Sequence, residues 1–345
     1  MEYTRLGSSG LNVSKICLGT MMFGDQTSPA TSSKIVSSAR DAGVNFIDTA
    51  DMYSMGDSER ITGKAIRRDR HDWVLATKVG NPMGEGILQR GISRKRIMKA
   101  CDDSLKRLGV DHIDLYYLHA DDPETPAEEP VRAMADLIQA GKICHWGVSN
   151  LKGWRIAQMA GLCDVLSLPR PTVCQPYYNA MNRMPEVDIL PACKAFGIGV
   201  VPFSPLARGV LTGKYDPNVK PDKNSRAGRG DQRMLNSEWR MESLVIAQKI
   251  KKFAAKKNMT PVDFAVNWVL NNRIVSSVIA GPRTLSQWKT YLGVLRHKFT
   301  AEDEAFIDGL VAAGHPSTPG YNDPKHPVLG REALTSNEAN RRSLS

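Results

Sequence analysis

Short apolar runs alternate with longer amphipathic stretches along almost the whole chain. The runs are continuous and rich in β-branched and aromatic residues, a pattern typical of strands buried on both faces. The stretches between them repeat apolar positions every three or four residues, which predicts helices that pack by one face. The predicted strands are residues 14–19, 44–50, 73–78, 113–119, 143–149, 172–176, 198–204 and 276–281.

Glycine and proline mark the ends of the predicted helices. Gly43, Gly109, Gly141 and Gly197 each follow an amphipathic stretch, where a left-handed cap favours glycine. Thr260-Pro261 precedes the apolar stretch VDFAVNWVLNN. Because threonine caps a helix N-terminus well and proline suits its first turn, we expect a helix to begin there.

Eight strands separated mostly by single helices predict a parallel sheet, for which two architectures compete. A (β/α)8 barrel, the TIM barrel, closes because right-handed crossovers in one direction bring the last strand back to the first. A doubly wound open sheet normally carries a GxGxxG turn after its first strand. The chain has GTMMFG at 19–24, which does not match. We therefore predict a single barrel domain over 1–345, with its core at about 14–313.

Three segments fall outside the βα repeat. Residues 3–14 predict a β-hairpin that turns at Ser8–Gly10 and could plug the barrel floor. Residues 215–240 are polar and rich in Gly, Pro and Arg, which predicts a long excursion loop of the kind that often serves function. Residues 314–345 predict an extended C-terminal tail.

Candidate chemistry gathers at the carboxyl ends of consecutive strands, where barrel enzymes build their sites. Asp48 lies at the end of one strand, with Tyr53 five residues further on, and Lys78 and His119 end the next two. We expect Lys78 to lower the pKa of Tyr53 by stabilising the phenolate, and Asp48 to pair with Lys78. With His119 hydrogen-bonded to the same carbonyl oxygen, the four groups could polarise a C=O bond and protonate it. A hydride donor would have to be a cofactor.

These residues lie within longer motifs that resemble the aldo-keto reductases, NAD(P)H-dependent oxidoreductases on a (β/α)8 barrel. The motifs are GVNFIDTADMYSMGDSERITGKAI, LATK, SLKRLGVDHIDLYYLH, QPYYNAMNR, FSPLARGVLTGKY and IAGPRT. They span about residues 2–313 and are most similar to the bacterial and potassium-channel β-subunit branch.

The resemblance implies roles for individual residues. Asp48, Tyr53, Lys78 and His119 match the family's catalytic tetrad, with Tyr53 as the proton donor. The other matching residues belong to the family's cofactor site. At the nicotinamide end they are Ser149, Asn150 and Gln175 for the carboxamide and Phe203 for the ring, and along the pyrophosphate they are Ser204, Pro205, Leu206 and Arg208. At the 2′-phosphate and adenine end they are Gly281, Arg283, Thr284, Gln287 and Tyr291, and the cofactor site also includes Asp48 and the first-strand loop Gly19, Thr20 and Met21.

Cofactor and substrate expectations follow from this match. Arg283 could grip a ribose 2′-phosphate, so we expect NADPH (NADP⁺) in preference to NADH. The substrate is expected to be a small aldehyde or ketone at an apolar mouth that also includes Tyr53 and His119. The other expected mouth residues are Met22, Phe23 and Tyr178, together with Met21.

Two other functions compete with a reductase. The β-subunit-like motifs also fit an NADP(H)-binding regulatory or redox-sensing protein with little turnover. A metal-dependent hydrolase on the same barrel would need paired ligands. The seven histidines form no HxH or HExxH pair and the six cysteines no CxxC pair, so no metal site is predicted. His112 and His145 are expected to be structural, and Cys144 and Cys174 to be buried, unreactive thiols.

Composition and charge limit the classes of binding partner that we expect. The formal charge of +10 comes from dispersed basic residues without an aromatic-rich RNA motif, so it indicates a solvated surface or an anionic ligand rather than nucleic acid. No apolar run approaches the ~18 residues that a membrane span needs, and residues 1–15 have no apolar signal core. We therefore expect a cytoplasmic protein without a membrane partner, and the pattern predicts no particular oligomer.

Overall fold

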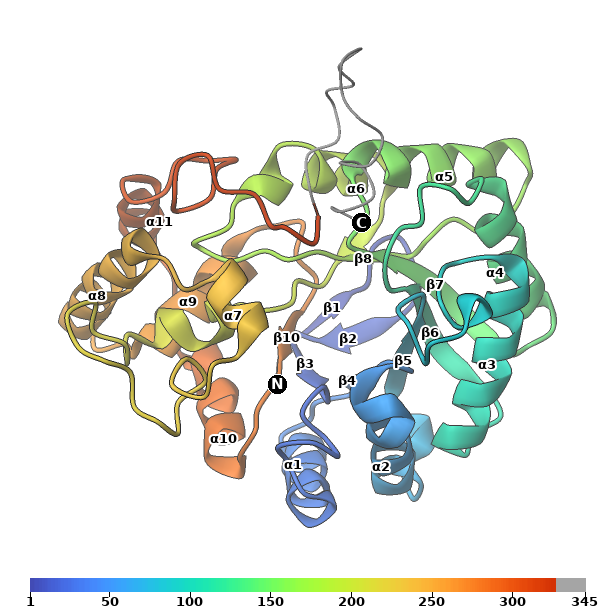
Figure 1. The fold of residues 1–345 in the computed structure, drawn as a ribbon, viewed down its shortest axis with the longest axis horizontal. Helices are drawn as coiled ribbons and strands as arrows, with labels where there is room; N and C mark the ends of the chain where they lie inside the picture. The colour runs from blue at the N-terminus through green and yellow to red at the C-terminus, as the bar shows by residue number, and fades with distance from the viewer. Residues whose placement is uncertain (327–345) are drawn as a thin grey trace.

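The structure is a computed structural model that describes residues 1–326. Within that range eight parallel strands form one sheet in the order β10-β3-β4-β5-β6-β7-β8-β9. In Figure 1 the strands curl around a common centre, with the helices outside them. The strands are β3 (Ile16–Gly19), β4 (Phe46–Asp48), β5 (Val74–Val79), β6 (Ile113–Leu118), β7 (Ile143–Ser149), β8 (Val173–Gln175), β9 (Gly199–Val200) and β10 (Val278–Ala280).

Hydrogen bonds between the two outermost strands close the sheet. The Ser276 N–H donates to the Val200 carbonyl at 2.8 Å, and the Ile279 N–H donates to the Pro202 carbonyl at 3.0 Å. β10 also pairs with β3 on its other side. The predicted (β/α)8 barrel is therefore confirmed. Each predicted strand overlaps an observed one, and only β5 extends past its predicted end, by one residue to Val79.

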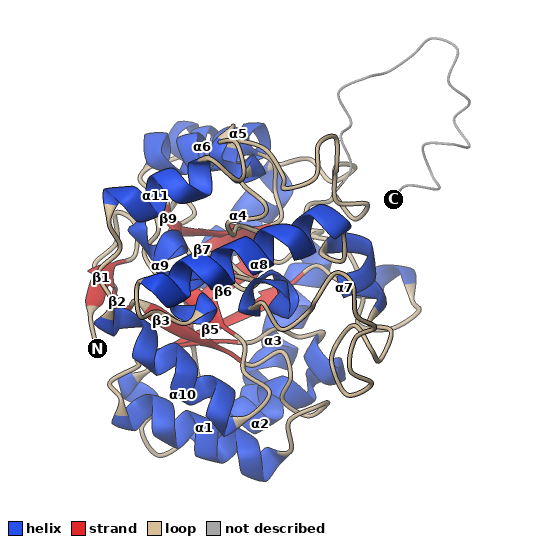
Figure 2. Ribbon diagram, turned by 90° about the vertical axis from the view of Figure 1, so that its left-hand side faces the viewer, coloured by secondary structure: helices blue, strands red, loops and turns tan. Residues whose placement is uncertain are grey.

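Helices cover the outer face of the barrel, as Figure 2 shows from the side. Gly109 and Gly197 end two of them with φ of 65° and 68°, as the sequence predicted. Thr260 caps another through a reciprocal capping box with Asp263. The helices are α1 (Pro29–Asp41), α2 (Asp57–Ile66), α3 (Arg94–Leu108), α4 (Glu128–Gln139), α5 (Gly153–Val165), α6 (Ile189–Phe196), α7 (Gln232–Ser237), α8 (Met241–Lys256), α9 (Pro261–Asn271), α10 (Leu285–Gly293) and α11 (Ala301–Asp308).

The predicted hairpin forms from β1 (Tyr3–Arg5) and β2 (Asn12–Ser14) and seals the amino-terminal end of the barrel. Its Leu6 is fully buried with the residues of the barrel interior. Gly7 has φ of +57°, and a Cβ there would lie 2.5 Å from the Gly199 nitrogen. Only glycine fits this close approach, because the hairpin backbone rests directly on the start of β9.

The long loop and the described part of the tail pack on each other. Residues 215–240 include α7, whose Met234 is buried. The Arg240 guanidinium lies 3.8 Å from the centre of the Tyr321 ring, and Arg233 pairs with Asp323. The tail therefore packs against the C-terminal part of this loop. The described part of the tail ends at residue 326, and the rest of the predicted tail, 327–345, lies outside the described residues. No helix in 1–326 has the length and apolar character of a membrane span.

Candidate active site

Strand alternation assembles the candidate site as one layer of the barrel interior. Phe46, Ala76 and Tyr117 point into the barrel core. Because side chains two residues apart share a face of a strand, the next interior positions on these strands are residues 48, 78 and 119. The top interior layer of the whole barrel is Gly19, Asp48, Lys78, His119, Ser149, Gln175, Phe203 and Gly281.

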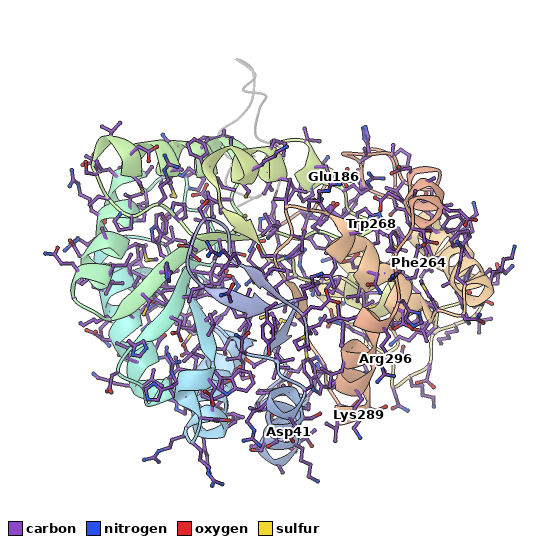
Figure 3. The ribbon with its side chains drawn as sticks, turned by 180° about the vertical axis from the view of Figure 1, so that it is seen from behind. Asp41, Glu186, Phe264, Trp268, Lys289 and Arg296 are labelled. Atoms are coloured by element: carbon purple, nitrogen blue, oxygen red, sulfur yellow. The ribbon has the colours of Figure 1, made fainter. Side chains whose placement is uncertain are left out.

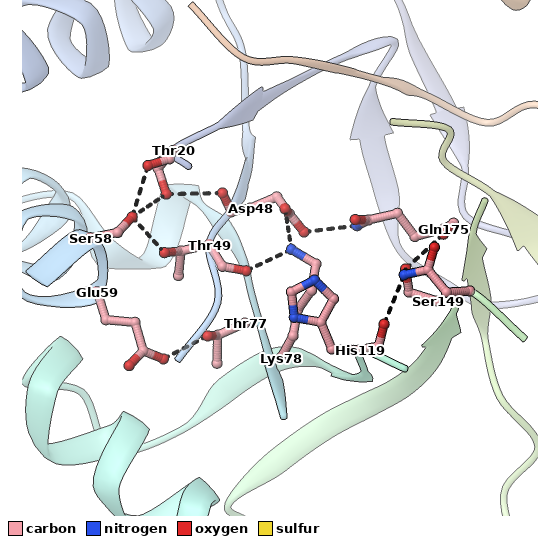
Figure 4. Close-up of polar contacts among 11 residues, drawn as sticks. Thr20, Asp48, Thr49, Ser58, Glu59, Thr77, Lys78, His119, Ser149 and Gln175 are labelled. Carbon is pink, nitrogen blue, oxygen red and sulfur yellow. Dashed lines mark hydrogen bonds and ion pairs between the residues drawn. The ribbon is translucent and has the colours of Figure 1, made fainter. Parts of the chain in front are cut away.

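A buried ion pair occupies the centre of this layer. The Lys78 ammonium contacts Asp48 and donates to the Thr49 carbonyl at 2.7 Å, and the Gln175 amide donates to the second Asp48 oxygen at 2.9 Å (Figure 4). Lys78 is fully buried, and Asp48 is 2% exposed. Burial raises the pKa of Asp48, and the contacts with Lys78 and Gln175 oppose that rise. Burial lowers the pKa of Lys78, but the charge and hydrogen bond of Asp48, together with the interaction with Tyr53, outweigh this effect and leave the pKa raised.

Tyr53 reaches this pair from a short, strained turn after β4. Ser54 and Met55 adopt φ of 49° and 52°, a left-handed conformation that costs about 1–2 kcal/mol for such residues. The Ser54 hydroxyl holds the turn by donating to the Phe23 carbonyl at 3.0 Å. The Lys78 ammonium lies 5.0 Å from the centre of the Tyr53 ring, and the rings of Tyr53 and His119 lie 5.7 Å apart, edge to face. All four predicted catalytic side chains are therefore together.

The pKa of Tyr53 differs from the sequence expectation in its net direction. Burial raises the pKa above its usual value of 10, and Lys78 lowers it only in part. The expected effect of Lys78 is present, but desolvation of the phenolate is larger. The hydroxyl therefore stays protonated at neutral pH, the state that a proton donor requires.

His119 is held as a neutral imidazole. Burial lowers its pKa well below the usual range, and Lys78 lowers it further. Its Nδ1 atom is buried without a hydrogen-bond partner in the part of the chain that the structure describes. A neutral ring beside an ammonium can donate a hydrogen bond to a carbonyl oxygen without adding a second positive charge.

We expect the neutrality of His119 to appear in the pH dependence of stability. The pKa of His119 in the folded state lies below the unfolded value of about 6.5. Its contribution to the free energy of unfolding is therefore complete above about pH 6.5 and is lost as the pH falls below that value, because the unfolded chain then binds a proton that the folded chain does not. By pH 5.5 this one group should cost about 1.4 kcal/mol. Urea denaturation at pH 7.5 and 5.5 should show this loss reduced in His119→Gln. The exposed His71 provides the control, because His71→Gln should keep the wild-type slope.

A second layer of hydrogen bonds, which the sequence did not predict, supports the turn that carries Tyr53. The Ser58 hydroxyl lies 2.9 Å from the hydroxyls of both Thr20 and Thr49 (Figure 4). The buried Glu59 accepts from the Thr77 hydroxyl at 2.6 Å and pairs with Arg107 at 2.5 Å. These bonds fix the start of α2 against β4 and β5. The sequence contained a signal for this layer, because polar residues occupy the side of α2 that is expected to face the core.

The residues predicted for the nicotinamide end form one hydrogen-bonded group. The Ser149 hydroxyl donates to the Gln175 carbonyl at 2.8 Å. The Asn150 amide donates to the Ser149 hydroxyl at 3.1 Å and to the His119 carbonyl at 2.9 Å. Phe203 lies beside them and stacks on Tyr177 with ring centres 5.6 Å apart.

The predicted pyrophosphate stretch has the backbone and charge of an anion site. After β9, Ser204, Ala207 and Arg208 have positive φ values of 56°, 46° and 51°. Such turns expose successive N–H groups that form an anion-binding concavity. The Arg208 Nε atom is buried without a hydrogen-bond partner among residues 1–326. An unsatisfied buried guanidinium nitrogen beside such a turn fits a phosphate group, which would complete its bonds.

The predicted far end of the cofactor site lies at the start of α10. Gly281 is exposed, and a Cβ there would meet nothing within 4 Å. The Gln287 side chain accepts from the Arg283 N–H at 2.8 Å, and Thr284 caps the helix. Tyr291 is 8% exposed and packs in the core, so little of its ring is available to a ligand.

Two residues predicted for the substrate mouth have buried side chains. Phe23 is fully buried in the core. Tyr178 is 2% exposed and donates to Glu186 at 2.8 Å, with its ring centre 5.1 Å from that of Trp268. Figure 3 shows Glu186 and Trp268 on the outer side of the barrel. These contacts turn Tyr178 away from the mouth, contrary to the prediction, whereas the role predicted for Phe23 stays a prediction.

Other apolar groups remain available at the mouth. Met21 is 38% exposed, and Met22 is partly buried. Met55, which the sequence interpretation did not select, is 58% exposed two residues after Tyr53. Tyr177 is partly buried and reaches the nicotinamide end through its stacking on Phe203.

This chain is similar to known proteins over most of its length. The family model described as the aldo/keto reductase family matches residues 15–312. A probable voltage-gated potassium channel subunit beta of Arabidopsis thaliana is 38% identical over 83% of this chain and 89% of its own length. The uncharacterized oxidoreductase YrpG of Bacillus subtilis is 36% identical over 83% and 89%. The L-glyceraldehyde 3-phosphate reductase of Escherichia coli O157:H7 is 30% identical over 91% and 93%.

Proposed function

Because the chain belongs to the aldo/keto reductase family, we propose that it is an NADPH-dependent carbonyl reductase that converts an aldehyde or ketone to an alcohol. The observation that carries this proposal is the position of Tyr53 over the buried Lys78–Asp48 pair and beside neutral His119. This group holds one protonated acid, one cation and one neutral hydrogen-bond donor around a single point. Reduction of a carbonyl needs these three functions on the oxygen side of the bond.

The chain's own residues would act on the carbonyl oxygen. A bound reduced nicotinamide supplies the hydride that adds to the carbonyl carbon. The Tyr53 hydroxyl donates a hydrogen bond to the carbonyl oxygen and transfers its proton there as negative charge develops. Lys78 stabilises the resulting phenolate, and Asp48 keeps Lys78 charged and oriented. His119 donates a second hydrogen bond to the oxygen and stays neutral throughout.

The proposed cofactor site follows the top layer from the nicotinamide end to the adenine end. The residues proposed to hold the carboxamide are Ser149, Asn150 and Gln175, and Phe203 is proposed to pack on the ring. Beyond it, the turn from Ser204 through Pro205 and Leu206 to Arg208 would hold the pyrophosphate. At the far end we propose Gly281, Arg283, Thr284, Gln287 and the rim of Tyr291, with Gly19, Thr20 and Met21 along the side.

The choice of NADPH rests on Arg283 and is testable by substitution. Loss of a charge-assisted hydrogen bond to a phosphate costs about 1.5–3 kcal/mol. We therefore expect Arg283→Ala to raise the dissociation constant for NADPH about 10- to 100-fold, with little change for NADH. Titration of cofactor fluorescence measures both constants. Lys289→Ala, six residues after Arg283 and within α10, is the control for a general loss of positive charge (Figure 3). Equal weakening of NADPH and NADH by Arg283→Ala would contradict the assignment.

The activity itself is tested by the loss of NADPH absorbance with a panel of carbonyl compounds. The panel should include sugar aldehydes, aromatic aldehydes, pyridoxal and ketosteroids. The proposal requires carbonyl-dependent NADPH oxidation, with one alcohol formed for each NADPH consumed. Tight NADPH binding without turnover on any member would instead favour the second candidate, an NADP(H)-binding regulatory or redox-sensing protein. Two relatives are named as probable voltage-gated potassium channel beta subunits, which favours a regulatory role over none at all.

A further inference from the structure

Three side chains of metal-ligand type lie together at the opposite end of the barrel from the candidate active site. His112 directly precedes β6, Asp114 is its second residue, and Cys144 is the second residue of β7. One ligand atom of each, an imidazole nitrogen, a carboxylate oxygen and the thiol sulfur, lies within 4.8 Å of the other two. No pair motif in the sequence marks these residues.

The strand register brings the three residues together. β6 and β7 pair Ile113 with Ile143 and Leu115 with His145. Asp114 and Cys144 lie between the same two pairs, so they project from the sheet side by side. His112 lies in the loop that directly precedes β6. The cluster is therefore built into the most extensively paired strands of the barrel.

Asp114 is already held in a ligand-like orientation. Its Oδ2 atom accepts from the Leu75 N–H at 2.8 Å and contacts Arg70 at 2.6 Å. Its Oδ1 atom lies 3.9 Å from the Nε2 atom of His112. Metal-ligating carboxylates commonly have their second oxygen hydrogen-bonded in this way. Arg70 is itself anchored by the Trp73 and His112 carbonyls, so it can remain on Oδ2.

The side chains of the other two residues, Cys144 and His112, are accessible to solvent. Cys144 is exposed, so the expectation that it is a buried thiol was wrong. The His112 side chain is 40% exposed. Ligands of a tetrahedral ion with bonds of about 2.0–2.3 Å need to approach more closely than the present separations, which rotation of these two exposed side chains allows.

We propose that His112, Asp114 and Cys144 form a Zn²⁺ site with its fourth position open to water. A nitrogen, oxygen and sulfur donor set suits zinc, whereas Mg²⁺ and Ca²⁺ prefer oxygen alone. Binding displaces the thiol proton, so affinity should increase with pH. Asp114 and His119 are five residues apart, about 16 Å along the strand. The ion would therefore tie together the starts of β6 and β7 and would not take part in carbonyl reduction.

Cobalt provides a spectroscopic test on the full-length protein. Co²⁺ bound to a thiolate gives an intense charge-transfer band in the near ultraviolet, and we expect this band in the wild type and its loss on adding Zn²⁺. Cys144→Ser should remove the band. His112→Ala should raise the Co²⁺ dissociation constant about 10-fold or more, because removing a ligand weakens metal binding more than removing a residue that only hydrogen-bonds to a ligand. His71→Ala, an exposed histidine in the adjacent turn, should leave the spectrum unchanged.

Thermal unfolding provides a second readout. Saturating Zn²⁺ should raise the midpoint of the wild type and not that of Cys144→Ser, while the two proteins share circular dichroism spectra and carbonyl-reduction rates. The proposal is overturned if saturating Co²⁺ gives no thiolate band in the wild type. It is equally overturned if the band persists in Cys144→Ser, or if His71→Ala abolishes it.

Discussion

Replacement of Tyr53 by phenylalanine should lower kcat/KM for carbonyl reduction about 100- to 10,000-fold, the range that a general acid contributes. The substitution removes only the hydroxyl, so the ring should keep its contacts with Lys78 and His119. The dissociation constant for NADPH should therefore change little. Steady-state kinetics and cofactor titration separate the two quantities.

Tyr117→Phe is the matched control for this prediction. The Lys78 ammonium also lies over the Tyr117 ring, 5.7 Å from its centre, but Tyr117 lies one layer deeper in the barrel interior. Loss of its hydroxyl should leave kcat within a few-fold of the wild type. Parental turnover in Tyr53→Phe, or an equal loss in the two variants, would exclude Tyr53 as the proton donor.

Lys78→Met is expected to lower the free energy of unfolding by about 3–5 kcal/mol as well as to abolish turnover, because it leaves a buried carboxylate without its counter-charge. Asp48 is 2% exposed, and its remaining side-chain partner is the Gln175 amide. Without Lys78 the pKa of Asp48 should rise further, since burial would act on it with less opposition. Urea denaturation at pH 7 measures the stability change.

A double variant distinguishes loss of the charge pair from loss of packing. Asp48→Asn with Lys78→Met removes both charges, so it should recover most of the lost stability while turnover stays absent. Lys99→Met serves as the surface control, because Lys99 is 69% exposed and its pair with Asp103 should contribute under about 1 kcal/mol. A double variant as unstable as Lys78→Met alone would show that the packing of the lysine stem dominates.

Local pattern was sufficient to predict most of the barrel and the members of the tetrad. Strands buried on both faces appear as continuous apolar runs, and each run overlaps an observed strand. Asp48, Lys78 and His119 lie at or near the ends of three such runs, and alternation from Phe46, Ala76 and Tyr117 places them on the interior face of the barrel. Their roles in binding and catalysis remain predictions that the variants above test.

Alternation also shows why one substrate residue was chosen incorrectly. Val173 and Gln175 face the barrel interior, so the next residue with the same parity is Tyr177, not Tyr178. The structure places Tyr177 against Phe203 and turns Tyr178 outward to Glu186. The alternation was present in the sequence. Because two tyrosines stand side by side beyond the end of β8, it was easy to choose the one that does not continue the interior-facing positions of the strand.

By itself, the sequence determined the order and nature of the secondary structure and the residues that end each strand, since both depend on periodicities of two and about four residues. Only the tertiary structure decided that burial outweighs Lys78 at Tyr53, that Glu59 meets Arg107, and that His112 and Asp114 meet Cys144. These outcomes depend on desolvation and on strand register between segments dozens of residues apart. Neither quantity is contained in any local stretch of chain, because each arises only when the barrel closes.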